Sequence, residues 1–139
     1  MSRSTDHQEG GCLCGALRFV VTAPALDAGY CHCRMCQKNS GAPVVAWATF
    51  PSTDFALTQG TPASYHSSAH AKQQFCSQCG SYLVFLSTKS PHEVSVNTAS
   101  FDHPEKFPPR KHIYAGARIG WFRTEDALPS YPDYGPASS

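Results

Sequence analysis

The sequence lacks the long hydrophobic run that a membrane-spanning helix needs. No apolar stretch in its 139 residues approaches the roughly 18 consecutive residues of a membrane span. The first eleven residues, MSRSTDHQEGG, are polar and contain no apolar segment of the kind found in a secretory signal. We therefore expect no membrane association and a cytoplasmic location.

The sequence also has little charge, and the charge is balanced. Charged residues make up 15% of the chain, and the formal net charge is +1. Lys and Arg are scattered, whereas a nucleic-acid-binding surface needs clustered positive charge. We expect no nucleic-acid partner. An oligomer is compatible with this sequence, but no feature of it indicates one.

What the sequence does contain is a series of short, strand-like segments divided by eleven prolines and ten glycines. β-Branched and aromatic residues, which favour strands, mark the segments 16–23, 43–50, 54–60, 63–67, 81–87, 92–100 and 111–116. One short helix is predicted over 34–40, ending at Gly41. This pattern predicts a mainly β domain of antiparallel sheets with at most short helices.

The length and the absence of repeats or long linkers indicate one domain. We place it at residues 10–131. Residues 1–9 are predicted to form a loose N-terminal arm. Residues 132–139 lie in a stretch rich in Pro, Ser and Gly and are predicted to form a flexible tail.

Seven cysteines are the strongest chemical signal in the chain. An odd number cannot pair completely, and cytosolic thiols stay reduced, so ligands are favoured over disulfides. Cys76 and Cys79 form a C-x-x-C pair followed by Gly, which is half of a tetrahedral zinc site. A redox dithiol is the less favoured alternative, because the βαβ context of such motifs is absent.

The second half of that zinc site is predicted at Cys12 and Cys14, also followed by Gly. In an extended segment, residues two apart point to the same side, so both sulfurs can reach one ion. A zinc ion bound by Cys12, Cys14, Cys76 and Cys79 would have a closed coordination sphere and a structural role.

The remaining cysteines, Cys31, Cys33 and Cys36, form a C-x-C-x-x-C triplet. Three ligands with an open fourth position are typical of a catalytic zinc site. His32 should point away from the other two ligands of its strand. Three alternatives stay open: a distant histidine (His66, His70, His103 or His112) completes a second structural site, the seven ligands divide differently, or the triplet is a redox sensor.

Three thiolates around zinc predict thiol chemistry. Such a site carries a net charge of −1, which makes it a weak activator of water and a better host for a soft sulfur ligand. A bound thiol would lose its proton although free thiols titrate near ~8.5. Arg34 and Lys38 flank Cys36 and are candidate anchors for substrate carboxylates; solvated helix residues are the equally weighted alternative.

These motifs resemble one family. GGCLCGALRF, YCHCRMCQKNSGAP and FCSQCGSYL, followed by ASFDHPEKFPPRKHIY, GWF and LPSY, are similar to the glutathione-dependent formaldehyde-activating (GFA) enzymes, which share their domain with centromere protein V. The resemblance runs from about Gly10 to Tyr131. It implies a β-tent-like fold, a structural zinc on the four-cysteine set, and an exchangeable zinc on Cys31, Cys33 and Cys36.

The resemblance implies an activity that joins formaldehyde to glutathione. We therefore expect a zinc-dependent carbon–sulfur lyase-type enzyme, with two zinc ions per chain, acting on a thiol and a small aldehyde. Cys31, Cys33 and Cys36 would be the catalytic set, and Arg34 and Lys38 would bind substrate. The alternative is a non-catalytic zinc module that binds a protein partner.

Overall fold

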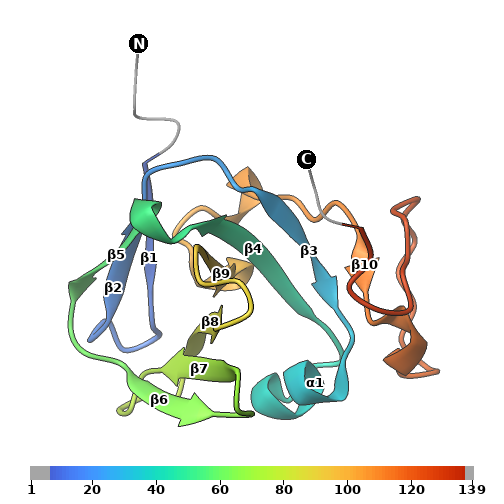
Figure 1. Cartoon of the computed structure of the whole chain (residues 1–139), viewed down its shortest axis with the longest axis horizontal. Coiled ribbons are helices and arrows are strands. Elements are labelled where there is room, and N and C mark those ends of the chain that lie inside the picture. The colour runs from blue at the N-terminus through green and yellow to red at the C-terminus, as the bar shows by residue number, and fades with distance from the viewer. Residues whose placement is uncertain (1–6, 137–139) are drawn as a thin grey trace.

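The computed structural model describes residues 7–136, which form two β-sheets (Figure 1). A three-stranded sheet has the order β1-β2-β5, and a seven-stranded sheet has the order β10-β3-β4-β9-β8-β7-β6. The strands are β1 (Gln8–Gly11), β2 (Arg18–Val21), β3 (Asp27–Cys31), β4 (Val45–Pro51), β5 (Phe55–Gln59), β6 (Ala63–His66), β7 (Ala71–Phe75), β8 (Tyr82–Ser87), β9 (Glu93–Asn97) and β10 (His112–Ile113). All strand pairings are antiparallel except that of β10 with β3. The predicted mainly β class is confirmed.

The two sheets share one hydrophobic core. Figure 1 shows β1, β2 and β5 together at one end of the molecule, while β4 crosses its middle. Phe19 of β2 and Phe50 of β4 are fully buried, and both rings contact Phe101, at centroid distances of 5.2 and 5.8 Å. Burying a side chain of this size stabilises a fold by roughly 1.5–3 kcal/mol. The aromatic cluster therefore holds the sheets together from within.

Strand β9 illustrates how the sequence pattern positions this core. Val94 and Val96 are buried, whereas the alternating residues Glu93 and Ser95 are more exposed, because successive strand residues point to opposite faces. Strand β4 is buried at most of its positions. It lies in the interior of the seven-stranded sheet between β3 and β9, where both of its edges are paired.

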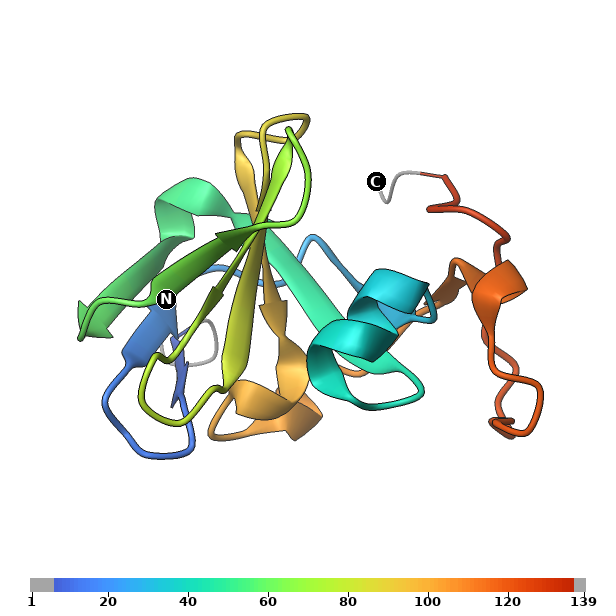
Figure 2. The ribbon, with the colours of Figure 1, turned by 90° about the horizontal axis from the view of Figure 1, so that it is seen from below.

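Helix α1 (Arg34–Ser40) is the α-helix of the described residues and coincides with the predicted segment. It begins at Cys33, whose sulfur accepts a hydrogen bond from the Cys36 backbone N–H, and ends at Gly41 with φ of 71°. Only glycine adopts that left-handed conformation without strain. Figure 1 shows α1 beneath the lower ends of β3 and β4, and Figure 2, seen from below, shows it in front of them. Single 3₁₀ turns lie at η1 (Ser52–Asp54), η2 (Thr98–Ser100), η3 (Pro104–Lys106) and η4 (Ala115–Ala117). No helix within residues 7–136 has the length and apolarity to cross a membrane.

Both ends of the described chain are more ordered than their composition predicts. Strand β1 starts at Gln8, inside the expected arm, because its backbone pairs with β2. In the expected tail, Tyr134 stacks on Trp47 with centroids 6.2 Å apart, and the Asp133 carbonyl accepts the Tyr114 N–H. The division of the chain at residues 10 and 131 stays a prediction. The rest of the expected arm and tail lies outside the described residues.

Candidate metal centre

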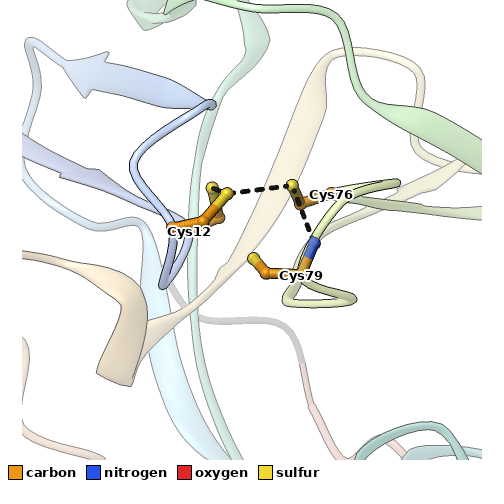
Figure 3. Close-up of side chains that lie close together, drawn as sticks. Cys12, Cys76 and Cys79 are labelled. Carbon is orange, nitrogen blue, oxygen red and sulfur yellow. Dashed lines mark hydrogen bonds between the residues drawn. The ribbon is translucent and has the colours of Figure 1, made fainter.

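Four cysteines from two turns meet between the sheets. Cys12 and Cys14 lie in the turn between β1 and β2, and Cys76 and Cys79 lie in the turn between β7 and β8 (Figure 3). Their four sulfurs lie within 4.8 Å of one another. Cys14 Sγ is 3.7 Å from both Cys12 Sγ and Cys76 Sγ. Two sulfurs bound to one tetrahedral zinc at ~2.3 Å would lie ~3.8 Å apart, so the cluster fits this ion.

The backbone around the four-cysteine cluster favours thiolates. Cys12 Sγ accepts the Leu17 N–H at 3.2 Å, and Cys76 Sγ accepts the N–H groups of Gln78 and Cys79 at 3.4 Å. A hydrogen bond with the Ser81 hydroxyl lowers the pKa of Cys79 to about 5. Donors that converge on sulfur stabilise its charged form, which is the form that binds metal.

Glycine permits both turns. Gly15 and Gly80 have φ values of 85° and 80°, and their N–H groups return to the carbonyls of Cys12 and Cys76. Both Cys-Gly sequences therefore end in a tight turn closed by glycine. Cys12 and Cys14 lie in this turn and not in the extended segment predicted for them. Since one turn belongs to each sheet, the cluster joins the sheets at a single point.

The other three cysteines meet at the end of β3. Cys31 is the last residue of the strand, Cys33 caps α1, and Cys36 lies in its first turn. Cys31 Sγ lies 3.4 Å from Cys33 Sγ and 3.0 Å from Cys36 Sγ, well beyond the ~2.05 Å of a disulfide. The structure therefore separates the seven cysteines into the same sets of four and three as their spacing predicts.

The protonation of the three-cysteine cluster shows why it suits a cation. Hydrogen bonds from the thiols of Cys31 and Cys36 lower the pKa of Cys33 to about 2. The same contacts raise the pKa of Cys36, and the neighbouring Cys33 raises that of Cys31 to about 12. One thiolate is thus stabilised at the expense of the other two. A bound divalent cation would allow all three sulfurs to ionise together.

None of the histidines in the described chain joins the three sulfurs as a fourth ligand. His32 is fully buried and its Nε2 lies 2.8 Å from His112 Nδ1. His112 Nε2 in turn lies 3.1 Å from both carboxylate oxygens of Asp126. Burial lowers the pKa of His32 to about 4. These two histidines therefore form a buried chain behind the cluster, and His70 is bonded elsewhere, to Thr88.

The three-cysteine cluster opens onto a cavity of about 210 Å³. All three cysteines line it, together with five aromatic residues: Trp47, Tyr82, Phe85, Tyr114 and Tyr134. A larger hollow of about 470 Å³ lies beside Cys12 and Leu13 but contains no member of this cluster. The smaller cavity is consequently the one that adjoins the candidate reactive site.

Tyr114 has an unusual backbone at this cavity. Its φ of 53° is the one positive value among the non-glycine residues of the described chain. Such a conformation costs energy and persists where surrounding contacts enforce it. Here the Tyr114 N–H donates to the Asp133 carbonyl at 2.9 Å. This contact links the Tyr114 side of the wall to the segment that carries Tyr134.

The predicted carboxylate anchors lie on α1 but do not line the cavity. Arg34 donates to the Gln37 side chain at 2.6 Å, and Lys38 is exposed. Their role in substrate binding stays a prediction. Sequence reasoning did not identify five residues at or near the site. Met35 and Tyr82 lie within the quoted motifs YCHCRMCQKNSGAP and FCSQCGSYL, but the spacing of the cysteines gives no information on their side chains. Phe85, Asp126 and Tyr134 reach the site through long-range packing and lie in no recognisable motif.

Comparison with known proteins identifies the family of the chain. The profile of a family described as glutathione-dependent formaldehyde-activating enzyme matches residues 7–117. An uncharacterized lyase of Schizosaccharomyces pombe is 31% identical over 102 residues, 67% of each chain. A Halomonas elongata protein named "Putative glutathione-dependent formaldehyde-activating enzyme" is 27% identical over 142 aligned positions, which cover 90% of this chain and 88% of the relative.

The fold is also similar to that of a solved structure. The crystal structure of a Rhodobacter sphaeroides protein matches with a TM-score of 0.58 and 23% sequence identity. The match covers 88% of this chain and 99% of that protein. At this identity, the comparison supports the architecture of the two sheets.

Proposed function

The chain belongs to the glutathione-dependent formaldehyde-activating enzyme family, and on that premise we propose that it is a zinc-dependent carbon–sulfur lyase-type enzyme. Its substrates are a thiol and a small aldehyde, for which glutathione and formaldehyde are the candidates that the family description supplies. One observation carries the proposal: three cysteine sulfurs without a fourth protein ligand among residues 7–136 line a cavity. The proposal includes a cytoplasmic location, where thiols stay reduced.

The two cysteine clusters have different roles in this proposal. Cys12, Cys14, Cys76 and Cys79 would hold a structural zinc, since four thiolates complete a tetrahedral site. Cys31, Cys33 and Cys36 would hold an exchangeable zinc. Zinc bound to three thiolates supplies one open position where an incoming thiol loses its proton and remains nucleophilic.

The chain's own residues orient the reactants around that position. The aromatic wall of the cavity would contact the aldehyde beside the three sulfurs and hold its carbonyl carbon near the incoming thiol. Arg34 and Lys38, on the helix that carries Cys36, would anchor the carboxylates of glutathione outside the cavity. The His32–His112–Asp126 chain would fix the backbone between Cys31 and Cys33.

The test is thiol binding to cobalt-substituted protein. Adding glutathione should produce a sulfur–cobalt absorption band and release protons, and binding should strengthen as pH rises toward the thiol's pKa near ~8.5. Cys33→Ser should abolish the signal, whereas Arg34→Gln should weaken glutathione far more than uncharged 2-mercaptoethanol. If neither the absorption band nor proton release appears at millimolar thiol, the proposal of an enzyme is refuted. The alternative, a non-catalytic zinc module that binds a protein partner, is then favoured.

A further inference from the structure

The cavity beside the three-cysteine cluster has an uncharged wall. Besides the cysteines and the five aromatic residues, it includes the apolar side chains of Met35, Val45 and Ile113. None of the described residues that line it is Lys, Arg, His, Asp or Glu. Two of its polar side chains are engaged within the protein: Ser95 with the Thr49 hydroxyl at 2.8 Å, and Asn97 with the Tyr82 carbonyl at 2.9 Å. The remaining polar groups of the lining residues, the tyrosine hydroxyls and the buried Trp47 Nε1–H, which has no partner, are also uncharged.

We propose that the aldehyde substrate carries an uncharged, apolar body, aromatic or branched aliphatic, which occupies this cavity. The inference rests on the proposed function for the reaction and adds the substrate class. The charged ends of a glutathione-type thiol remain outside the cavity, on the side of α1 that carries Arg34 and Lys38. The carbon that joins the sulfur and the group attached to it lie inside.

Charge argues for this arrangement. A carboxylate inside the cavity would lose its hydration and find no cation on the wall. It would also lie near three sulfurs that carry negative charge when they hold a metal. Aldehydes with an acidic group are therefore disfavoured, and an uncharged body avoids both penalties.

Size and shape argue against formaldehyde as the best partner. At ~30 Å³ per water molecule, 210 Å³ corresponds to about seven waters, whereas formaldehyde has a single carbon. Most of the apolar wall would stay hydrated around it. A planar ring would instead pack against the stacked pair formed by Trp47 and Tyr134, since aromatic side chains favour such ring contacts.

The chemistry is the same addition with a larger aldehyde. The thiol sulfur forms a bond to the carbonyl carbon, the C=O π electrons move to oxygen, and the thiol proton ends on that oxygen. The product is an S-(1-hydroxyalkyl) thioether, and the reverse reaction breaks the same C–S bond. No electrons are lost or gained, so no oxidant or reductant is required.

The first measurement is binding, independent of turnover. Benzyl alcohol and 4-(hydroxymethyl)benzoate share a ring and a hydroxymethyl group but differ by one carboxylate. In ligand-detected NMR with the zinc-loaded protein, benzyl alcohol should bind at least about tenfold more tightly, because the carboxylate is unpaired in the cavity. Met35→Arg places a cation at the rim, where Met35 is 37% exposed, and should reverse this preference. Met35→Leu is the matched control and should not.

The second measurement is exchange between glutathione and its adducts, followed by NMR with benzaldehyde, 4-carboxybenzaldehyde and formaldehyde. We expect the largest acceleration with benzaldehyde. Equal binding of the two probes, or the largest acceleration with formaldehyde, would overturn the inference while leaving the proposed function intact. No acceleration with any aldehyde, together with preferred binding of benzyl alcohol, would refute the proposed function and support the apolar ligand class.

Discussion

Replacing Cys76 with serine tests the structural role of the four-cysteine cluster. Cys76 is 1% exposed and belongs to the main hydrophobic core. The Ser oxygen can still accept the N–H groups of Gln78 and Cys79, so local hydrogen bonding is preserved. It is, however, a poor zinc ligand at a site otherwise made of thiolates. The substitution therefore removes the metal cross-link and little else.

The expected loss of stability follows from the number of residues between the linked cysteines. Cys14 and Cys76 are separated by 62 positions, and a covalent link of that span stabilises a fold by about 4 kcal/mol through loop-closure entropy. Cys31 and Cys36 are separated by five, for which the same relation gives about 2 kcal/mol. Cys36→Ser, which removes one thiol from the local cluster, is accordingly the matched control.

The assay is denaturant unfolding at a fixed, buffered concentration of free zinc, followed by circular dichroism. Cys76→Ser should lose about 4 kcal/mol and Cys36→Ser no more than about half of that. At roughly 3–4 °C per kcal/mol for a chain of this size, Cys76→Ser should melt about 12 °C or more below the wild type. A Cys76→Ser protein that melts within a few degrees of wild type, or no lower than Cys36→Ser, would refute the assignment of a structural zinc.

Three further outcomes are expected. Gentle chelation of the two-zinc protein should remove one zinc while the circular dichroism spectrum stays unchanged, because the three-cysteine cluster lacks a fourth protein ligand within residues 7–136. If metal analysis shows that both zinc ions leave together and the fold is lost, the two-site proposal is contradicted. Tyr114→Asn should retain stability, whereas the β-branched Tyr114→Val should lose about 1–2 kcal/mol in denaturant unfolding, because its φ is 53°; equal stabilities would argue against the left-handed backbone. His112→Phe should cost about 1–3 kcal/mol in denaturant unfolding, because the buried His32 Nε2 loses its partner, whereas the exposed Asp126 keeps the Leu128 N–H; Thr124→Ala is the milder control.

Local features of the fold were accessible from the sequence. The apolar run at 81–87 and the alternation of Val94 and Val96 predicted β8 and β9, and Gly41 predicted the end of α1. Strand β1 could not be predicted from the sequence. Its sequence, QEGG, has no strand propensity, and Gly10 is required because a Cβ there would lie 2.5 Å from the Phe19 ring and the Ser100 carbonyl. Tertiary packing, which the local sequence does not encode, determines this strand.

The metal ligands could be predicted from the sequence, whereas the cavity wall could not. Short spacers place Cys31, Cys33 and Cys36 together almost by chain geometry alone, and matching Cys-Gly turns identified the other pair of half-sites. The cavity wall, by contrast, comes from β4, β8, β9, β10 and the segment after it. Tyr134 in particular lies in a Pro- and Gly-rich stretch whose composition indicates a tail. Its contact with Trp47 depends on how that stretch returns along the sheet.

The contrast between the two clusters explains how one ligand type can serve two purposes in a small domain. The four-cysteine cluster connects separate sheets, so a metal bound there would contribute folding energy and would have to be retained. The three-cysteine cluster is assembled by the β3–α1 connection, which is also held by the His32 N–H bonded to the Ile113 carbonyl. Because this backbone contact involves no metal ligand side chain, we expect a metal at the three-cysteine cluster to exchange a ligand without loosening the fold. In the proposed function, the closed four-cysteine site would therefore maintain the fold while the three-cysteine site reacts.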